Sequence, residues 1–319
     1  MSQPVSLQIN LAPGDYPHVR YLLPHQLKIL AAQVDEVILN VDAQPGKGRF
    51  AQGWEKYRLL LDDFLANEIQ PLYKVKIIPV DYAEQTRERV AEMFFGEKDI
   101  PAKDFRGGPY YAYFYGLYST SNDLVFHLDS DIFLGGASQK WVAKAVETLN
   151  SDPSCLIVSP LPGPPHPDDI LIGQAGAKKI GPYRYTFNGM STRIFMMDKA
   201  KLIRQKLSPA KPSFRNQLKA IIEGNSNADL PEHILSSYMI KNNLKRIDFS
   251  GTGDGLWSLH PPYRTEIFYN TLPELIKKIE TGNIPEQQYG FYDMVDEMCD
   301  WTDAREKLKQ NRWWKRVLK

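Results

Sequence analysis

The chain has little cysteine and no excess of charge. Only Cys155 and Cys299 occur among 319 residues, far apart and outside any Cys-x-x-Cys pair. This excludes a disulfide framework and a cysteine-rich zinc site, and it favours the reducing cytoplasm. The 39 Lys and Arg residues oppose 38 Asp and Glu residues, so the net charge is +1. We therefore expect no general attraction to nucleic acid.

Long apolar runs are also missing. No stretch approaches the roughly 18 consecutive apolar residues that a membrane span needs. Residues 1–10 lack the basic start and apolar core of a signal peptide, and we find no repeat or low-complexity tract. The content of 43% hydrophobic and 24% charged residues is ordinary for a globular protein. The length allows one large domain or two that pack closely.

Strand and helix patterns alternate through the first half. We expect strands at 5–11, 34–41, 73–80 and 123–128, and helices near 22–31, 54–65, 83–95 and 110–118. This alternation predicts an α/β fold with a Rossmann-like, mostly parallel central sheet and helices on both faces. Ligands of such sheets bind beyond the carboxyl ends of the strands, where Asp42 and Asp129 stand.

The second half is less regular. We expect strands at 192–197 and 245–249, a helix at 231–242, loops at 159–167, 221–228 and 250–255, and a basic, aromatic helix over 303–319. The proline-dense segment 159–167 is predicted to be neither helix nor strand.

Two aspartates follow the fourth expected strand. The apolar run that ends at Leu128 leads directly into Asp129-Ser130-Asp131. Hard divalent cations prefer oxygen ligands, and two carboxylates this close repel each other without a cation. The triplet alone fits a metal site or two solvated turn residues.

Three further motifs follow this triplet in the chain. They are the glycine-bearing segment 187–193, the acidic helix start Pro231-Glu232-His233, and the late histidine of Trp257-Ser258-Leu259-His260. Over about residues 5–264 this ordered set resembles glycosyltransferases with the GT-A fold, closest to the inverting family 2 type. The resemblance implies a UDP- or GDP-sugar donor, a Mn²⁺ or Mg²⁺ cofactor and a hydroxyl acceptor that is a saccharide, a lipid-linked molecule or another small molecule.

The resemblance also implies roles for the acidic triplet and the late histidine. Asp131 would bind the metal, and Asp129 would hold the donor ribose or a metal-bound water. His260 would be a further metal or diphosphate ligand, and its other interpretation is a loop histidine held by backbone bonds.

The catalytic carboxylate is expected at the start of helix 231–242. A base there would take the proton of the acceptor hydroxyl as it attacks the anomeric carbon. The usual Glu-Asp pair of the family reads Glu232-His233 here, so Glu232, His233 and Asp229 all stay candidates for the base. Glu232 also fits a first-turn acid that complements the helix dipole.

The donor nucleotide is expected beside the first strands. Asp42 would hold the base or ribose, with Asn40 and Asp15 as weaker candidates. Arg106 suits the nucleotide or diphosphate because a guanidinium matches phosphate oxygens, although its segment also fits a plain helix-entry loop. Gly189 would let the backbone approach the donor sugar or acceptor.

On this resemblance the chain divides into three parts. Residues 1–131 would form the nucleotide-sugar half, 132–270 the smaller acceptor and catalytic half, and 271–319 a helical extension. Trp257 would stack on a sugar or fill the core. The cationic, tryptophan-rich segment 312–319 fits peripheral membrane contact or a helix packed on the protein.

Other classes fit less well. A haloacid-dehalogenase-type phosphatase usually has threonine or valine four residues after its first aspartate, where this chain has Phe133. A nucleotidyltransferase normally has a glycine-rich, basic loop after the first strand, where this chain has Ala12-Pro13-Gly14-Asp15. The remaining alternative is a nucleotide-sugar-binding protein that kept the fold and lost the base.

Overall fold

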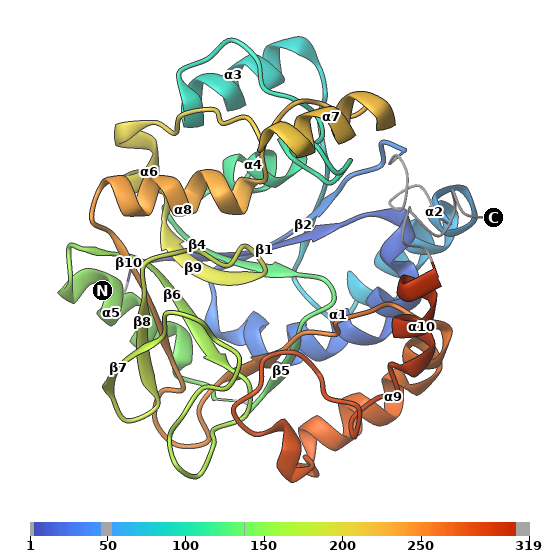
Figure 1. Ribbon diagram of the computed structural model, residues 1–319, viewed down its shortest axis with the longest axis vertical. Coiled ribbons are helices and arrows are strands. Elements are labelled where there is room, and N and C mark those ends of the chain that lie inside the picture. The colour runs from blue at the N-terminus through green and yellow to red at the C-terminus, as the bar shows by residue number, and fades with distance from the viewer. Residues whose placement is uncertain (1–2, 46–52, 137, 311–319) are drawn as a thin grey trace.

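A single large sheet organises the chain (Figure 1). The computed structural model describes residues 3–45, 53–136 and 138–310. The strand order is β3-β2-β1-β4-β9-β6-β10-β8-β7. The strands are β1 (Val5–Leu11), β2 (Glu36–Val41), β3 (Lys76–Pro79), β4 (Leu124–Asp129), β6 (Cys155–Pro162), β7 (Lys178–Gly181), β8 (Arg184–Phe187), β9 (Ile194–Asp198) and β10 (Lys245–Phe249).

Seven of these strands point the same way: β7, which like β10 is antiparallel to β8, and six others. Strands β1 to β4 are mutually parallel, and β9 is antiparallel to both β4 and β6, so β6 runs with β4. Strand β10 is parallel to β6. The carboxyl ends of β1, β2, β3, β4, β6 and β10 therefore share one edge of the sheet. Two short strands, β5 (Phe133–Gly135) and β11 (Trp257–Leu259), pair beside this edge, and β11 also pairs with β6.

Helices cover both faces of the sheet (Figure 1). On one face lie α1 (Tyr16–Leu30), α2 (Trp54–Phe64) and α5 (Trp141–Ser151). On the other lie α3 (Glu84–Phe95), α4 (Tyr111–Tyr118), α6 (Lys199–Gln205), α7 (Phe214–Glu223) and α8 (Pro231–Lys241). Helices α9 (Glu266–Glu280) and α10 (Thr302–Gln310) follow, and Glu280 of α9 contacts His25 of α1 at 3.1 Å.

The alternation of side chains along β4 shows why both faces are covered. Leu124, Phe126 and Leu128 enter the core beneath α1, while Val125 enters the core beneath α4. An apolar strand of this kind is buried on both sides, as expected for a parallel sheet. The predicted α/β fold with a mostly parallel central sheet is confirmed.

The expectation of an irregular segment at 159–167 was wrong for its first part, because β6 continues to Pro162. Prolines 160 and 162 alternate with residues whose N–H groups donate hydrogen bonds to β11 or the residue before it. Leu161 donates to the carbonyl of Leu256 at 3.2 Å, and Gly163 donates to that of Ser258 at 2.9 Å. At positions 160 and 162 the pairing with β11 requires no N–H donor from β6. The strand therefore tolerates both prolines.

The expected loop at 221–228 was also partly wrong. Helix α7 runs to Glu223 and ends at Gly224, whose φ of 65° is left-handed. Glycine adopts this conformation without steric cost, which makes it a common helix terminus. The predicted basic helix over 303–319 is present as α10 to Gln310, and the cluster 312–319 lies outside the described residues.

The sequence predicts a boundary between two parts of the chain at residue 131. The central sheet contains strands from both sides of that position. Strand β9, from the second half, lies between β4 and β6. Within the described ranges, no helix has the length and apolar character needed to cross a bilayer. Cys155 and Cys299 are both buried and free.

Candidate active site

The turn that carries the acidic triplet is anchored by helix α1. The Nε2 atom of Gln26, which is fully buried, lies 3.2, 3.3 and 2.8 Å from the carbonyl oxygens of Asp129, Ser130 and Ile132. His18, also on α1, contacts the Ser130 hydroxyl at 3.0 Å. Helix α1 therefore fixes the position of the turn at the carboxyl end of β4.

Asp131 is neutralised by an arginine that sequence reasoning missed. Nη2 and Nε of Arg264 donate to Oδ2 of Asp131 at 2.6 and 3.1 Å, and Nη1 donates to Asp15 at 3.2 Å. Burial alone would raise the pKa of Asp131, but the Arg264 guanidinium outweighs burial and holds that pKa below its usual range. Burial raises the pKa of Asp15 to about 6, although Arg264 opposes it.

The predicted metal ligands do not form a metal site as they are placed. Oδ2 of Asp131 is taken by Arg264, and Nδ1 of His260 lies 2.8 Å from Oδ1 of Asp293. Across residues 3–45, 53–136 and 138–310, no group of three or more His, Cys, Asp or Glu side chains is arranged to hold a metal ion. The side chains have suitable chemistry for Mn²⁺ or Mg²⁺, but a guanidinium stands where the cation would contact Asp131.

Asp129 is more accessible than Asp131. Its side chain is 40% exposed, and its Oδ1 lies 3.3 Å from Nε2 of the fully buried His127. His127 in turn contacts Gln8 of β1 at 2.6 Å. Asp129 can therefore meet a ligand while a buried polar contact holds its inner side.

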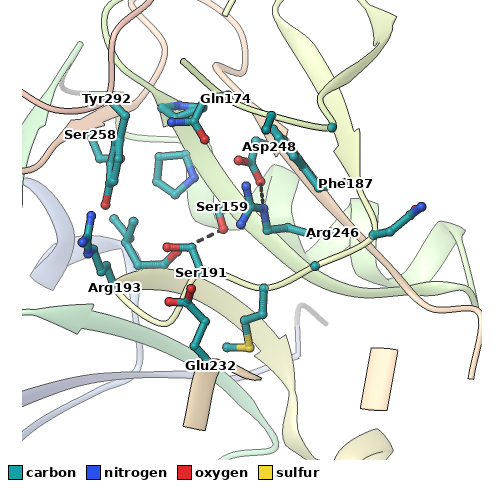
Figure 2. Close-up of a pocket in the computed structure, with 18 of the residues that line it drawn as sticks. Ser159, Gln174, Phe187, Ser191, Arg193, Glu232, Arg246, Asp248, Ser258 and Tyr292 are labelled. Atoms are coloured by element: carbon teal, nitrogen blue, oxygen red, sulfur yellow. Dashed lines mark hydrogen bonds and ion pairs between the residues drawn. The ribbon is translucent and has the colours of Figure 1, made fainter. Parts of the chain in front are cut away.

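A cavity of about 590 Å³ is lined in part by Arg193 (Figure 2), whose carbonyl accepts the N–H of Asp129. Its walls come from β6, β8, β10, the first turn of α8 and residues 174–178 and 292–293. Such a volume suits a small organic ligand. Gly189, Ser191, Arg193 and Glu232 all line it, so the second and third sequence motifs meet in one pocket.

Glu232 points into this pocket toward Ser191 (Figure 2). Among the described residues, the hydrogen bonds of its Oε2 are long: 3.3 Å to Oγ1 and 3.5 Å to the N–H of Thr192. Bonds of this length are weak, so the carboxylate can accept a proton from a ligand hydroxyl. His233 is instead exposed and pairs with Asp229 at 2.8 Å, and neither of these lines the pocket.

Arg193 joins the pocket to the acidic turn. Its carbonyl accepts the N–H of Asp129 at 2.7 Å, and its guanidinium lies 3.8 Å from Asp293. Burial would lower the pKa of Arg193, but Tyr292, Asp293 and the carboxylates of the triplet together raise it. Arg193 therefore lies next to both the acidic turn and the pocket that Glu232 lines.

The expected nucleotide-binding residues lie further along the same edge. Asp42 directly follows β2, forms an ion pair with Lys103 at 2.8 Å and accepts a hydrogen bond from Tyr82 at 3.1 Å. Asn40 is buried and accepts from the Ser119 hydroxyl at 2.8 Å. Strand β2 is separated from β4 by β1 alone. These positions leave the predicted nucleotide roles open.

In the described structure, the contacts of three further candidates, Arg106, Gly189 and Trp257, do not by themselves indicate a bound ligand. The guanidinium of Arg106 lies over the ring of Phe105 at 5.1 Å. A Cβ at Gly189 would meet only Ser236, at 3.6 Å, so nothing in the described structure requires glycine there. Trp257 is buried against Gly135, where a Cβ would lie 2.0 Å from the indole. Of the two interpretations of Trp257, the geometry supports core packing.

Some site residues were not predicted, and two of them had a detectable pattern. Arg246 and Asp248 are opposite charges two residues apart on β10, so both side chains fall on the same face of that strand. Such a pair at alternate positions of a strand indicates a polar surface on that side of the strand. Arg264 and Asp293 had no comparable pattern, because their loops meet the site only through the tertiary fold.

No protein-family model matches the chain, and no curated protein matches it by sequence. Among solved structures, the chain is similar to glycosyltransferases. One is the glucosyl-3-phosphoglycerate synthase of Mycobacterium tuberculosis in complex with Mn²⁺, UDP and phosphoglyceric acid, at 15% identity and a TM-score of 0.27 over 49% of this chain and 42% of that one.

Two others cover more of the chain. The mannosyltransferase PcManGT from Pyrobaculum calidifontis, in complex with GDP-Man and Mn²⁺, is 11% identical with a TM-score of 0.39 over 89% of this chain and 64% of its own. TarS 1–349 of S. aureus is 9% identical with a TM-score of 0.37 over 80% and 60%. This chain thus spans less than two thirds of the length of all three. Scores this low carry no functional argument, so function rests on the site itself.

Proposed function

We propose that the protein transfers a sugar from a UDP- or GDP-sugar to the hydroxyl group of an acceptor that occupies the pocket. The observation that carries this proposal is the placement of Glu232. Its loosely held carboxylate points into a cavity of about 590 Å³ that shares Arg193 with the acidic turn. A base and a site for an anionic donor therefore adjoin each other.

The chain's own residues suggest how the reaction would proceed. Asp42 is proposed to hold the donor's base or ribose, and Arg193 and Arg264 would offset the charge of the diphosphate. The acceptor oxygen would bond to the anomeric carbon while Glu232 takes its proton. The bond to the diphosphate oxygen breaks, and the diphosphate leaves with the electron pair. Such a base is worth about 100- to 10,000-fold in rate. Inversion is inferred from the family resemblance.

Metal dependence is a separate part of the proposal. The resemblance predicts Mn²⁺ or Mg²⁺ at Asp129, Asp131 and His260, but Arg264 already holds Asp131. We therefore assign no catalytic step to a metal. Arg264 and a cation would compete for the Asp131 carboxylate, and this competition is testable by itself. A cytoplasmic location, with peripheral membrane contact through residues 312–319, stays a prediction.

Donor consumption by the purified protein tests the transferase. UDP- and GDP-sugars are offered with hydroxyl acceptors, and release of the nucleoside diphosphate is measured. We expect one donor to be consumed, and Glu232→Gln to lower kcat at least 100-fold with unchanged nucleotide affinity. His233→Asn is the control, because this exposed side chain lies outside the pocket, and it should stay active.

Two results would change the assignment. Normal turnover by Glu232→Gln would remove Glu232 from the role of base. Tight nucleotide-sugar binding by a wild-type protein that transfers to no acceptor would favour the alternative of a binding protein that lacks the base.

A further inference from the structure

Buried polar atoms without partners gather around the same pocket. In the described part of the chain, the Ser258 hydroxyl and the Tyr292 hydroxyl have no hydrogen-bond partner, and both residues line the cavity. Ser258 is only 1% exposed. Because a buried polar group without a partner is costly, native proteins nearly always satisfy it with protein, water or ligand. These hydroxyls therefore indicate a ligand that offers hydrogen bonds.

A buried ion pair forms another wall of the pocket. Nε of Arg246 lies 2.8 Å from Oδ1 of Asp248, and both residues are more than nine-tenths buried (Figure 2). In the described part of the chain neither Nε nor Oδ1 has a hydrogen-bond partner, so this contact is an ion pair without hydrogen-bond geometry. The pair thus presents N–H donors beside a carboxylate acceptor, and both are shielded from bulk water.

A vicinal diol matches this arrangement. One hydroxyl group accepts a hydrogen bond from the guanidinium, and its neighbour donates one to the carboxylate. A single phosphate or carboxylate group would pair with Arg246 but would be repelled by Asp248. An alkyl chain would leave both charges, and the Ser258 hydroxyl, without partners.

The charges of the whole lining point the same way. Three cationic residues, Lys178, Arg193 and Arg246, face three acidic residues, Glu232, Asp248 and Asp293. The lining therefore has no excess charge with which to attract an anionic acceptor.

We propose that the acceptor is a neutral saccharide. Its vicinal diol binds the Arg246–Asp248 pair, another hydroxyl binds Ser258, and the reacting hydroxyl faces Glu232. This inference rests on the proposed function, since it names the acceptor class of that same pocket.

Ligand-observed NMR on the donor-free protein tests the proposal. The probes are glucose, mannose, galactose, N-acetylglucosamine, cellobiose and maltose, with glucose 6-phosphate and n-octanol as the anionic and apolar comparisons. We expect at least one neutral sugar to bind and n-octanol not to bind. Glucose 6-phosphate should bind no more tightly than glucose.

Two variants locate the binding. Ser258→Ala should weaken sugar binding about three- to ten-fold, the worth of one hydrogen bond. It should leave Tm unchanged or raise it, since it removes an unpartnered buried hydroxyl. Asp248→Asn should weaken binding at least as much. Ser208→Ala, which removes an exposed serine outside the pocket, is the control and should bind as the wild type does.

Each contrary result overturns the inference. Equal sugar affinity in the wild type, Ser258→Ala and Asp248→Asn would remove these residues from the acceptor site. Binding of glucose 6-phosphate alone, or of n-octanol alone, would assign a different acceptor class. If no neutral sugar binds while UDP or GDP does, the acceptor class is wrong and the proposed function stands. If the wild type binds neither UDP nor GDP, the proposed function itself fails.

Discussion

Replacing Arg264 by glutamine should destabilise the protein and create a site for a divalent cation. The change removes the guanidinium that donates two hydrogen bonds to Asp131. Breaking a fully buried ion pair costs about 3–5 kcal/mol because it leaves a charge without a partner. Asp131 is 6% exposed but Arg264 is 42% exposed, so solvent screening reduces this cost. We expect the free energy of unfolding to fall by about 2 kcal/mol.

The response to Mn²⁺ should reverse that loss. Without Arg264, no guanidinium neutralises Asp131, and a divalent cation can bind the carboxylates of Asp129 and Asp131 instead. A ligand that binds only the folded protein, at tenfold its Kd, stabilises by about 1.4 kcal/mol. We therefore expect saturating MnCl₂, compared with EDTA, to raise the stability of Arg264→Gln by at least this amount and that of the wild type by less. Urea unfolding followed by fluorescence measures both.

A matched arginine supplies the control. Arg305 is also 42% exposed and makes two contacts with Asp296, at 2.8 and 2.7 Å, but Asp296 is 50% exposed. Arg305→Gln should lower the free energy of unfolding by less than Arg264→Gln does, with no Mn²⁺ effect beyond that of the wild type. An equal Mn²⁺ effect in the wild type and Arg264→Gln would refute the competition. A stability loss no larger than that of Arg305→Gln would refute the importance of burial at Asp131.

Two further predictions concern buried positions. Burial raises the pKa of Asp248 from 3.8 to about 6, so between these pH values the folded chain binds a proton more tightly than the unfolded chain. Stability should therefore fall by up to about 3 kcal/mol as the pH rises through this window, and Asp248→Asn should flatten that slope in urea titrations at several pH values. An unchanged slope would contradict the effect of burial. Gly135→Ala should lower the free energy of unfolding by about 2 kcal/mol or more, because the new Cβ would lie 2.0 Å from the Trp257 ring. Gly189→Ala, with its nearest neighbour at 3.6 Å, should be close to neutral, and similar Tm losses in the two variants would contradict the packing argument.

The first half of the fold was predictable because its information is local. Strands β1, β2 and β4 are apolar runs, and helices with regular spacing separate them. Strand β6 was not fully predictable, since its prolines are tolerated only because of the pairing with β11, about 100 residues later. Proline content alone suggested a loop, and the partner strand decided otherwise.

The candidate site divides in the same way. Asp129, Asp131 and Glu232 are candidates because of their motifs and strand ends, and the structure places Arg193 near all three. Arg264 could not be identified, because its contact with Asp131 depends on how α9 and the loop before it approach α1. The sequence therefore offered acidic candidates, whereas the cations beside them became visible only in the tertiary structure.

The amide of Gln26 has a consequence for how this site can change during evolution. It bonds to main-chain carbonyls of the acidic turn, which every amino acid possesses. The side chains at 129 and 131 can therefore be exchanged without loss of these anchoring bonds. Replacement of either aspartate would therefore keep the backbone position of the turn, whereas replacement of Gln26 would remove all three anchoring bonds.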